Sequence, residues 1–323
     1  GDLFIATECL GGYRNLVLIV ALFPFGIFIL GALFRTAVLL MKALRAHKRA
    51  DKVSDEGRKS ITELRTWRGL FRQGLLQTLP LALILIFLFC PSISAVVFDA
   101  FHCESFSTNT DAGEERYFLY NYRDIECYSS DQSYYANLNL ALVFILLWPV
   151  GSLIFWAVLL RRARHALTEH KPTSFSRALS FMYRDYRSDL YYWEWLELFR
   201  KLFLTSFVLL NPESAAFIRH FVAVLFSLFF ILAQIVMRPH RHTATGAISL
   251  MCQVVILVTY LGATYMKLFD EFSLLYDEPS AIQAILTFSS VDQIAIMCLG
   301  VIALLVVLCL LYTSDAADEV DRG

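Results

Sequence analysis

Long apolar runs separated by polar connections occupy most of this sequence. Apolar residues make up 57% of the 323 residues, and the mean hydropathy is +0.56. A soluble domain of this composition would expose large apolar patches, so the chain is predicted to be an integral membrane protein. A helix needs about 20 residues to cross a bilayer. Seven windows come close to that length: Asn15–Phe34, Leu75–Val97, Leu138–Leu160, Tyr191–Leu210, Ala216–Met237, Ala247–Lys267 and Val291–Leu311.

Helices are the expected form of these windows, because an open sheet cannot satisfy its backbone polar groups in lipid. We therefore predict an all-α membrane protein with about seven transmembrane helices. Residues 1–74 would hold the first helix and a basic cytoplasmic loop. Residues 75–311 would form a six-helix bundle with an outer loop at residues 98–133.

Lys and Arg side chains are concentrated in alternate connections between the predicted spans. Because basic loops stay on the cytoplasmic side, this alternation predicts an outside N-terminus and a cytoplasmic C-terminus. We expect the plasma membrane as the location. The basic connections are Arg35–Arg72, the one after Leu160 and the one after Met237, whereas Asp99–Asp131, Asn211–Ala215 and Asp270–Glu278 are acidic or short.

Both ends of the sequence carry unusual signals. The chain opens at Gly1 without an initiator methionine or a signal peptide, which is typical of a piece of a longer protein. Near the other end, Cys309–Glu319 reads CLLYTSDAADE and resembles the translated read-through of a sequencing-library adaptor. We expect residues 309–323 to be a non-native tail; an acidic cytoplasmic tail is the alternative.

Two cysteines, Cys103 and Cys127, lie in the predicted outer loop. An oxidising compartment favours a disulfide between them. In the chain-entropy estimate, closing a loop of about 25 residues stabilises the fold by about 3 kcal/mol. We therefore predict a Cys103–Cys127 disulfide.

The third predicted span contains Trp148-Pro149-Val150-Gly151. Pro149 has no backbone N–H and frees a carbonyl group, while Gly151 permits close approach of a neighbouring helix. We predict a kink at Pro149 and Gly151. A structural kink is one interpretation, and a gating hinge is the other.

The run Phe181–Leu210 begins polar and tyrosine-rich and ends apolar. Its purely apolar part, Leu202–Leu210, is too short to cross a bilayer, so a span here must include charged side chains. One interpretation is an anchored helix end whose charges reach the inner interface. The other is a buried charge network that couples the cytoplasmic loop to movement of the bundle. The charged residues are Glu194, Glu197, Arg200 and Lys201.

A second acidic cluster lies between the sixth and seventh predicted spans. Acidic rings at the mouth of a pore concentrate cations, so these side chains are candidates for a pore mouth. A solvated loop on the membrane surface is the alternative. The residues are Asp270, Glu271, Asp277 and Glu278.

No catalytic motif stands out in the sequence. It contains no HExxH, no GxSxG and no phosphate-binding glycine loop. His240 and His242 have no Cys or carboxylate close enough in sequence to complete a metal site, so ordinary interfacial histidines are expected. We expect no enzymatic activity, no metal, no cofactor and no nucleic-acid partner.

The run LSFMYRDYRSDLYYWEWLELFRKLFL, residues 179–204, resembles an aromatic-rich segment in the membrane modules of large protist and algal surface proteins. Those proteins often carry cysteine-rich, ephrin-receptor-like repeats ahead of a region loosely similar to transient receptor potential (TRP) channels. The Trp148–Gly151 motif, the two outer-loop cysteines and Arg238-Pro239 agree with this family, although His240 replaces its tyrosine. The resemblance covers about residues 75 to 265.

The resemblance implies a TRP-like cation channel or sensory module, embedded in the lipid bilayer as part of a longer protein. The last six predicted spans would follow a six-helix channel subunit, with cations as the permeating species and a homo-oligomer as the assembly. The fifth predicted span carries Arg219 alone, so no voltage sensor of the Arg-repeat type is expected. The alternative is a non-conducting seven-span receptor or a membrane anchor for an extracellular region.

Overall fold

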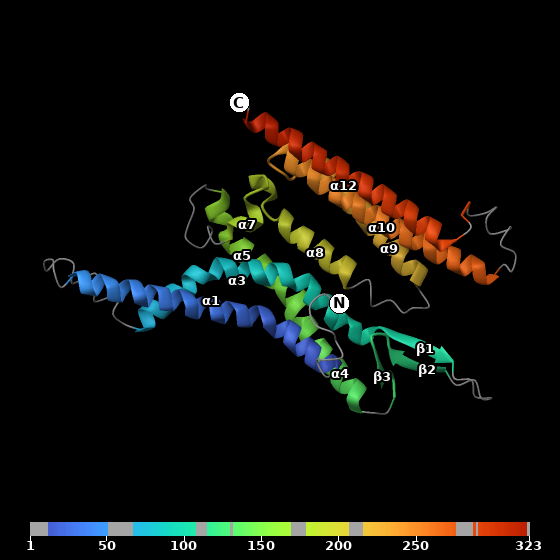
Figure 1. Cartoon of the computed structure of the whole chain (residues 1–323), viewed down its shortest axis with the longest axis horizontal. Coiled ribbons are helices and arrows are strands. Elements are labelled where there is room, and N and C mark those ends of the chain that lie inside the picture. Colours follow the sequence, from blue (N-terminus) through green and yellow to red (C-terminus); the bar gives the residue numbers. More distant parts are fainter. Residues whose placement is uncertain are drawn as a thin grey trace. The chain divides into compact units, whose positions relative to one another are not determined.

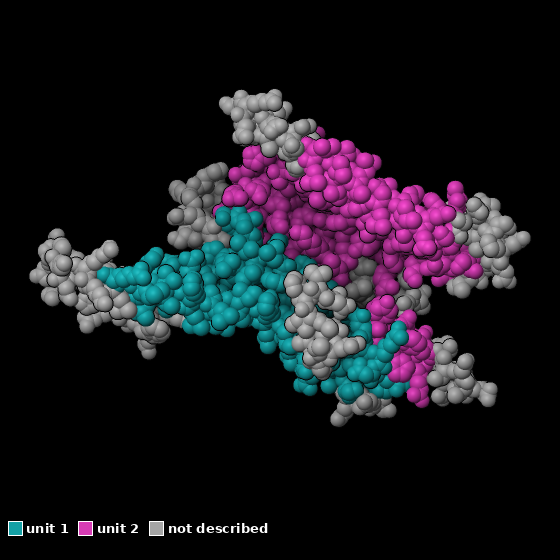
Figure 2. All heavy atoms as spheres, viewed as in Figure 1, with its two compact units in different colours: residues 1–100, 121–181 teal, residues 101–120, 182–323 magenta. Residues whose placement is uncertain are grey.

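The computed structural model describes eight stretches of the chain in two compact units. The first unit contains residues 1–100 and 121–181, and the second contains residues 101–120 and 182–323 (Figure 2). The described stretches are residues 12–50, 67–107, 115–129, 132–168, 179–206, 216–275, 287–288 and 290–321.

Within these stretches, six helical segments are long and apolar enough to span a membrane. They fall on six of the seven predicted windows, so the chain is a multi-pass helical membrane protein. The remaining window, Tyr191–Leu210, contains a shorter helix, α8 (Trp193–Thr205), and residues 207–210 lie outside the described part. The six are α1 (Tyr13–Ala50), α3 (Trp67–Phe98), α4 (Gln132–Ile145) continued by α5 (Gly151–Thr168), α9 (Ala216–Met237), α10 (Thr243–Leu275) and α12 (Val291–Asp321).

In the first unit, α1 packs along α3 (Figure 1). Small residues permit this approach, since a Cβ added to Gly31 of α1 would lie 3.2 Å from the Thr78 methyl group of α3. At one end of the pair, the buried Tyr13 hydroxyl donates a hydrogen bond to the Val97 carbonyl at 3.0 Å. The ring of Tyr13 also meets the ring of Tyr122 edge-on. One aromatic side chain therefore fixes the end of α1 against α3.

A five-residue π-helical turn, η3 (Leu146–Val150), connects α4 to α5 and contains Pro149. The Gly151 N–H donates to the Leu146 carbonyl, which is the hydrogen bond of a π turn. A Cβ at position 151 would lie 2.8 Å from that carbonyl oxygen. Gly151 is thus required by its own helix, whereas its expected role was approach of a neighbouring helix. The sequence predicts a kink at Pro149 and Gly151, and the structure has this π-helical turn at that place.

The predicted outer loop contains a small three-stranded sheet, which the all-α prediction did not include. Its strands are β1 (Cys103–Ser107), β2 (Glu115–Leu119) and β3 (Tyr122–Glu126), in the order β1-β2-β3. Strands β1 and β2 are antiparallel, with Cys103 opposite Leu119. A two-residue turn at residues 120–121 joins β2 to β3. The predicted disulfide between Cys103 and Cys127 is confirmed.

In the second unit, α10 packs against both α9 and α12, as Figure 1 shows. The contact between α10 and α12 is close at Gly262, where an added Cβ would meet the Cys298 sulfur at 2.5 Å. Nearer the end of α10, buried Phe269 packs with Ile294 of α12. These contacts make α10 the central helix of the unit.

Helix α8 runs antiparallel to α9. Leu204, near the end of α8, clusters with Ala223 in the first half of α9. Arg200, one turn earlier in α8, lies near the ring of Phe230, farther along α9. A helix of 13 residues is about 20 Å long, against about 30 Å of hydrocarbon. The described part of α8 therefore enters the bundle beside α9 over roughly two thirds of a membrane thickness.

The π turn generates a stability prediction. We expect Gly151→Ala to destabilise the protein by about 1–3 kcal/mol, because the new methyl group overpacks against the Leu146 carbonyl. Thermal unfolding in detergent, followed by tryptophan fluorescence, measures the change. Gly26→Ala in α1 is the matched control, since nothing lies within 4 Å of its Cβ position. Equal unfolding temperatures for the two variants would contradict the role of Gly151.

Candidate functional site

The charged side chains of α8 divide between a buried face and a more exposed one. The buried face contains Trp193, Glu197 and Arg200, together with the fully buried Leu198 and Leu202. Glu197 and Arg200 are three residues apart, so their side chains are neighbours on the helix surface. Glu194 and Lys201 form the more exposed pair, with 19% and 45% of their side chains accessible.

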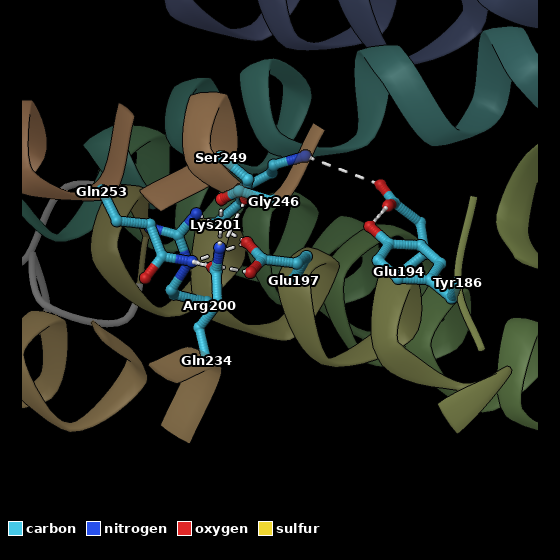
Figure 3. A network of polar contacts seen from close by, with 9 residues as sticks. All are labelled: Tyr186, Glu194, Glu197, Arg200, Lys201, Gln234, Gly246, Ser249 and Gln253. Atoms are coloured by element: carbon cyan, nitrogen blue, oxygen red, sulfur yellow. Dashed lines mark hydrogen bonds and ion pairs between the residues drawn. The ribbon is translucent and has the colours of Figure 1, made fainter. Parts of the chain in front are cut away.

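Glu197 and Arg200 form a buried ion pair (Figure 3). The Arg200 Nε and Nη2 atoms both donate to Glu197 Oε2, at 2.9 and 2.6 Å. Only 8% of the Glu197 side chain and 7% of the Arg200 side chain are exposed. These charges therefore lie inside the helical unit and do not extend to solvent.

Two glutamines connect the ion pair to the neighbouring helices. The Gln253 amide of α10 donates to Glu197 Oε1 at 2.9 Å and also to Gln234 Oε1 of α9. The Gln234 amide in turn donates to the Gly246 carbonyl at 3.2 Å. The Ser249 hydroxyl donates to Gln234 Oε1 at 3.3 Å, so one continuous network joins α8, α9 and α10 (Figure 3). We call Glu197, Arg200, Gln234 and Gln253 the polar network.

The polar network is energetically expensive for a membrane protein. Transferring two charges out of water costs several kcal/mol per ion. The attraction between the two ions offsets this cost only if hydrogen bonds satisfy their remaining donors and acceptors. Gln253 supplies such a bond to the second oxygen of Glu197. Ionisable groups within membrane helices commonly mark functional sites. The polar network is therefore the candidate site of this chain.

A second group of contacts surrounds Glu194 at the start of α8. Lys201 Nζ lies 3.8 Å from Glu194 Oε1, and the Tyr186 hydroxyl donates to Glu194 Oε2. Burial, and then the negative charge of Glu194, raise the pKa of Tyr186 well above its usual value. Tyr186 therefore stays protonated at neutral pH and remains a hydrogen-bond donor.

The segment before α8 is fastened to the turn between α9 and α10. The Arg187 N–H donates to the Pro239 carbonyl at 2.9 Å, and the Arg241 N–H donates to the Asp185 carbonyl at 3.0 Å. The Arg241 side chain also donates to the Tyr186 carbonyl. We call these contacts between residues 185–187 and 239–241 the turn clasp. It positions the segment that leads into α8 against the helices that carry Gln234 and Gln253.

The acidic pore-mouth candidates occupy different surroundings. Asp270 and Glu271 lie on the last turns of α10, which continues beyond the predicted end at Lys267, and both side chains are exposed. Asp277 and Glu278 lie outside the described residues. Nothing in the described stretches groups three or more His, Cys, Asp or Glu side chains in a way that could hold a metal ion.

Gln234 and Gln253 were missed from the sequence, although each carries a usable signal. Each is the single amide of a window that is mostly apolar. An amide in hydrocarbon needs a partner, and such side chains commonly form hydrogen bonds between helices. The partner itself could not be found without knowing how α8, α9 and α10 pack.

The ion pair predicts an asymmetric response to mutation. We expect Arg200→Leu to destabilise the protein by about 3–5 kcal/mol, because Glu197 is left as an uncompensated buried charge. The double variant Glu197→Leu/Arg200→Leu removes both charges and should recover most of that loss. Unfolding by denaturing detergent, followed by circular dichroism, measures the difference.

The exposed pair of Arg187 and Asp189, 3.0 Å apart, supplies the control. Arg187→Leu should change stability by no more than about 1 kcal/mol, because both side chains are more than half exposed. If Arg200→Leu were as mild as Arg187→Leu, Glu197 and Arg200 would not be a buried pair.

Comparisons with known proteins give no relative from which a function could be taken. No family model matches the sequence, and no curated protein or solved structure matches it. Any function assigned to the chain therefore rests on its own residues, chiefly the polar network and the turn clasp.

Proposed function

We propose that the chain is the membrane-embedded module of a larger surface protein and acts as a cation channel or sensory module of the TRP-like kind. Its N-terminus lies outside the plasma membrane and its C-terminus in the cytoplasm. The polar network carries this proposal. Because a buried ion pair inside a membrane bundle costs stability, its presence on α8, joined through Gln253 to α9 and α10, favours a role in function.

The polar network is suited to transmit movement between the segment before α8 and the bundle. Coupling between distant sites runs through packed side chains and hydrogen-bond networks on rigid elements. The turn clasp holds the segment before α8. Glu197 meets Gln253 of α10 about one turn beyond Trp193, where α8 begins. A displacement of that segment would therefore reach α10 through α8.

Cation conduction is the activity that we assign to the acidic end of α10. The exposed carboxylates of Asp270 and Glu271 raise the local concentration of cations. In a homo-oligomer, α10 and α12 of each copy would surround the pore. Most of the described α12 side chains are exposed, which leaves this helix free to face lipid or another copy.

Flux through the purified full chain in liposomes tests the proposal. We expect a cation flux that falls about threefold or more in Asp270→Asn/Glu271→Gln, because the local cation concentration decreases. Asp124→Asn, which removes an exposed charge from β3, is the control and should leave the flux unchanged. A protein that passes no cations would contradict the channel assignment and favour the non-conducting seven-span receptor or anchor.

The coupling role of the polar network has its own test in the same liposomes. Glu197→Leu/Arg200→Leu should stay folded yet alter the fraction of time for which the pore conducts. A double variant with unchanged flux would show that the network only supports the fold.

A further inference from the structure

His240 occupies the centre of the turn clasp. Its backbone pairs with that of Tyr186 in an isolated antiparallel bridge. Its imidazole ring lies 5.0 Å from the Tyr186 ring at an interplanar angle of 38°. On the other side, a Cβ added to Gly246 in the first turn of α10 would lie 3.5 Å from the Cβ of His240. The imidazole therefore fills the space between the segment before α8 and the start of α10.

Both ring nitrogens of His240 are buried, and within the described part of the chain neither has a hydrogen-bond partner. A neutral imidazole carries one N–H, whereas the protonated ring carries two and a full charge. A buried donor without an acceptor is costly, and a buried charge without a partner is more so. The closed clasp thus accepts the neutral ring and disfavours the protonated one.

Charged groups of both signs surround this ring. Burial lowers the pKa of His240 below its usual value, and the negative charges of Glu197 and Asp185 oppose this shift only in part. Arg238 and Arg241 lie on the same turn, within two residues of His240 in the sequence. At the start of α10, the residue against the ring is Gly246, which does not titrate. The other ionisable residues along these segments are Tyr183, Arg184, Tyr186, Arg187, Asp189, Tyr191, Tyr192, Glu194 and His242.

We propose that His240 makes the turn clasp a proton-sensitive latch, closed when the ring is neutral and released when the ring takes up a proton. Release would free residues 185–187 from residues 239–241, because a protonated ring must leave its buried position to reach water. This inference does not require the chain to conduct, since the latch is a property of the clasp itself.

The direction of the pH dependence follows from the depressed pKa. In the open clasp His240 is solvated and titrates near the ordinary value of about 6.5, whereas the closed clasp takes up its proton at lower pH. The stability of the closed clasp relative to the open clasp is therefore greatest above about pH 6.5 and decreases as the pH falls below that value. For one proton excluded from the closed form, a change from about pH 7.5 to about pH 5.5 shifts the equilibrium about tenfold towards the open form.

Hydrogen exchange at the backbone amides of Arg187 and Arg241 reads the latch directly, because both N–H groups donate across the clasp. With the full chain in lipid nanodiscs, and after correction for intrinsic exchange rates, we expect protection of both amides to fall about tenfold over that pH range. His240→Phe keeps a ring against Tyr186 and cannot titrate, so its protection should not change with pH. His242→Gln, at an exposed histidine two residues away, should behave like the unmodified protein.

A pH-independent clasp in the unmodified protein, or a pH dependence that survives in His240→Phe, would overturn the proposal. If His240→Phe does not fold, NMR titration of the imidazoles in the unmodified protein decides the matter. The pKa of His240 should then lie below the ordinary value of about 6.5, and a pKa at or above that value would overturn the latch. Neither readout depends on cation flux, so loss of the proposed channel activity would leave the result intact.

Discussion

The ion pair between Glu197 and Arg200 constrains how the helices of the second unit pack. Two charges in an apolar environment must remain together, and their unused lone pairs need donors. Gln253 meets that need from α10, and it also donates to Gln234 of α9. Helix α8 therefore enters the unit at one depth and one rotation, with its charged face towards α9 and α10.

The same constraint relates the two halves of the candidate site. The turn clasp holds the residues before α8 by backbone hydrogen bonds, while the polar network holds α8 itself by side chains. Between them lies the Tyr186–Glu194 hydrogen bond, which joins the clasp to the first turn of α8. Movement at the turn between α9 and α10 thus has a continuous polar route into the bundle. That route is the physical basis for the sensory or channel role that we propose.

Hydropathy and length predicted most of the membrane helices, because lipid leaves the backbone few alternatives. The window at Tyr191–Leu210 was harder, since its charges could equally lie at the interface or within the bundle. Whether Glu197 and Arg200 lie within the bundle depends on a partner such as Gln253, which is 56 residues from Glu197 in the sequence. The small sheet was not predicted, because strands of five residues leave only a short alternating pattern in the sequence. By contrast, predicting the Cys103–Cys127 disulfide required only two cysteines in one predicted outer loop.

The central claim is that Arg200 is ion-paired inside the protein and not extended to the interface. Exchange of the arginine Nε–H groups with deuterated water, followed by nitrogen-15 NMR in nanodiscs, tests it most directly. The resonance that disappears in Arg200→Lys should be protected from exchange, because its N–H donates to buried Glu197 at 2.9 Å. The exposed Arg187 should exchange like free arginine. If the Arg200 and Arg187 resonances exchanged at the same rate, the buried pair, and with it the proposed coupling, would be contradicted.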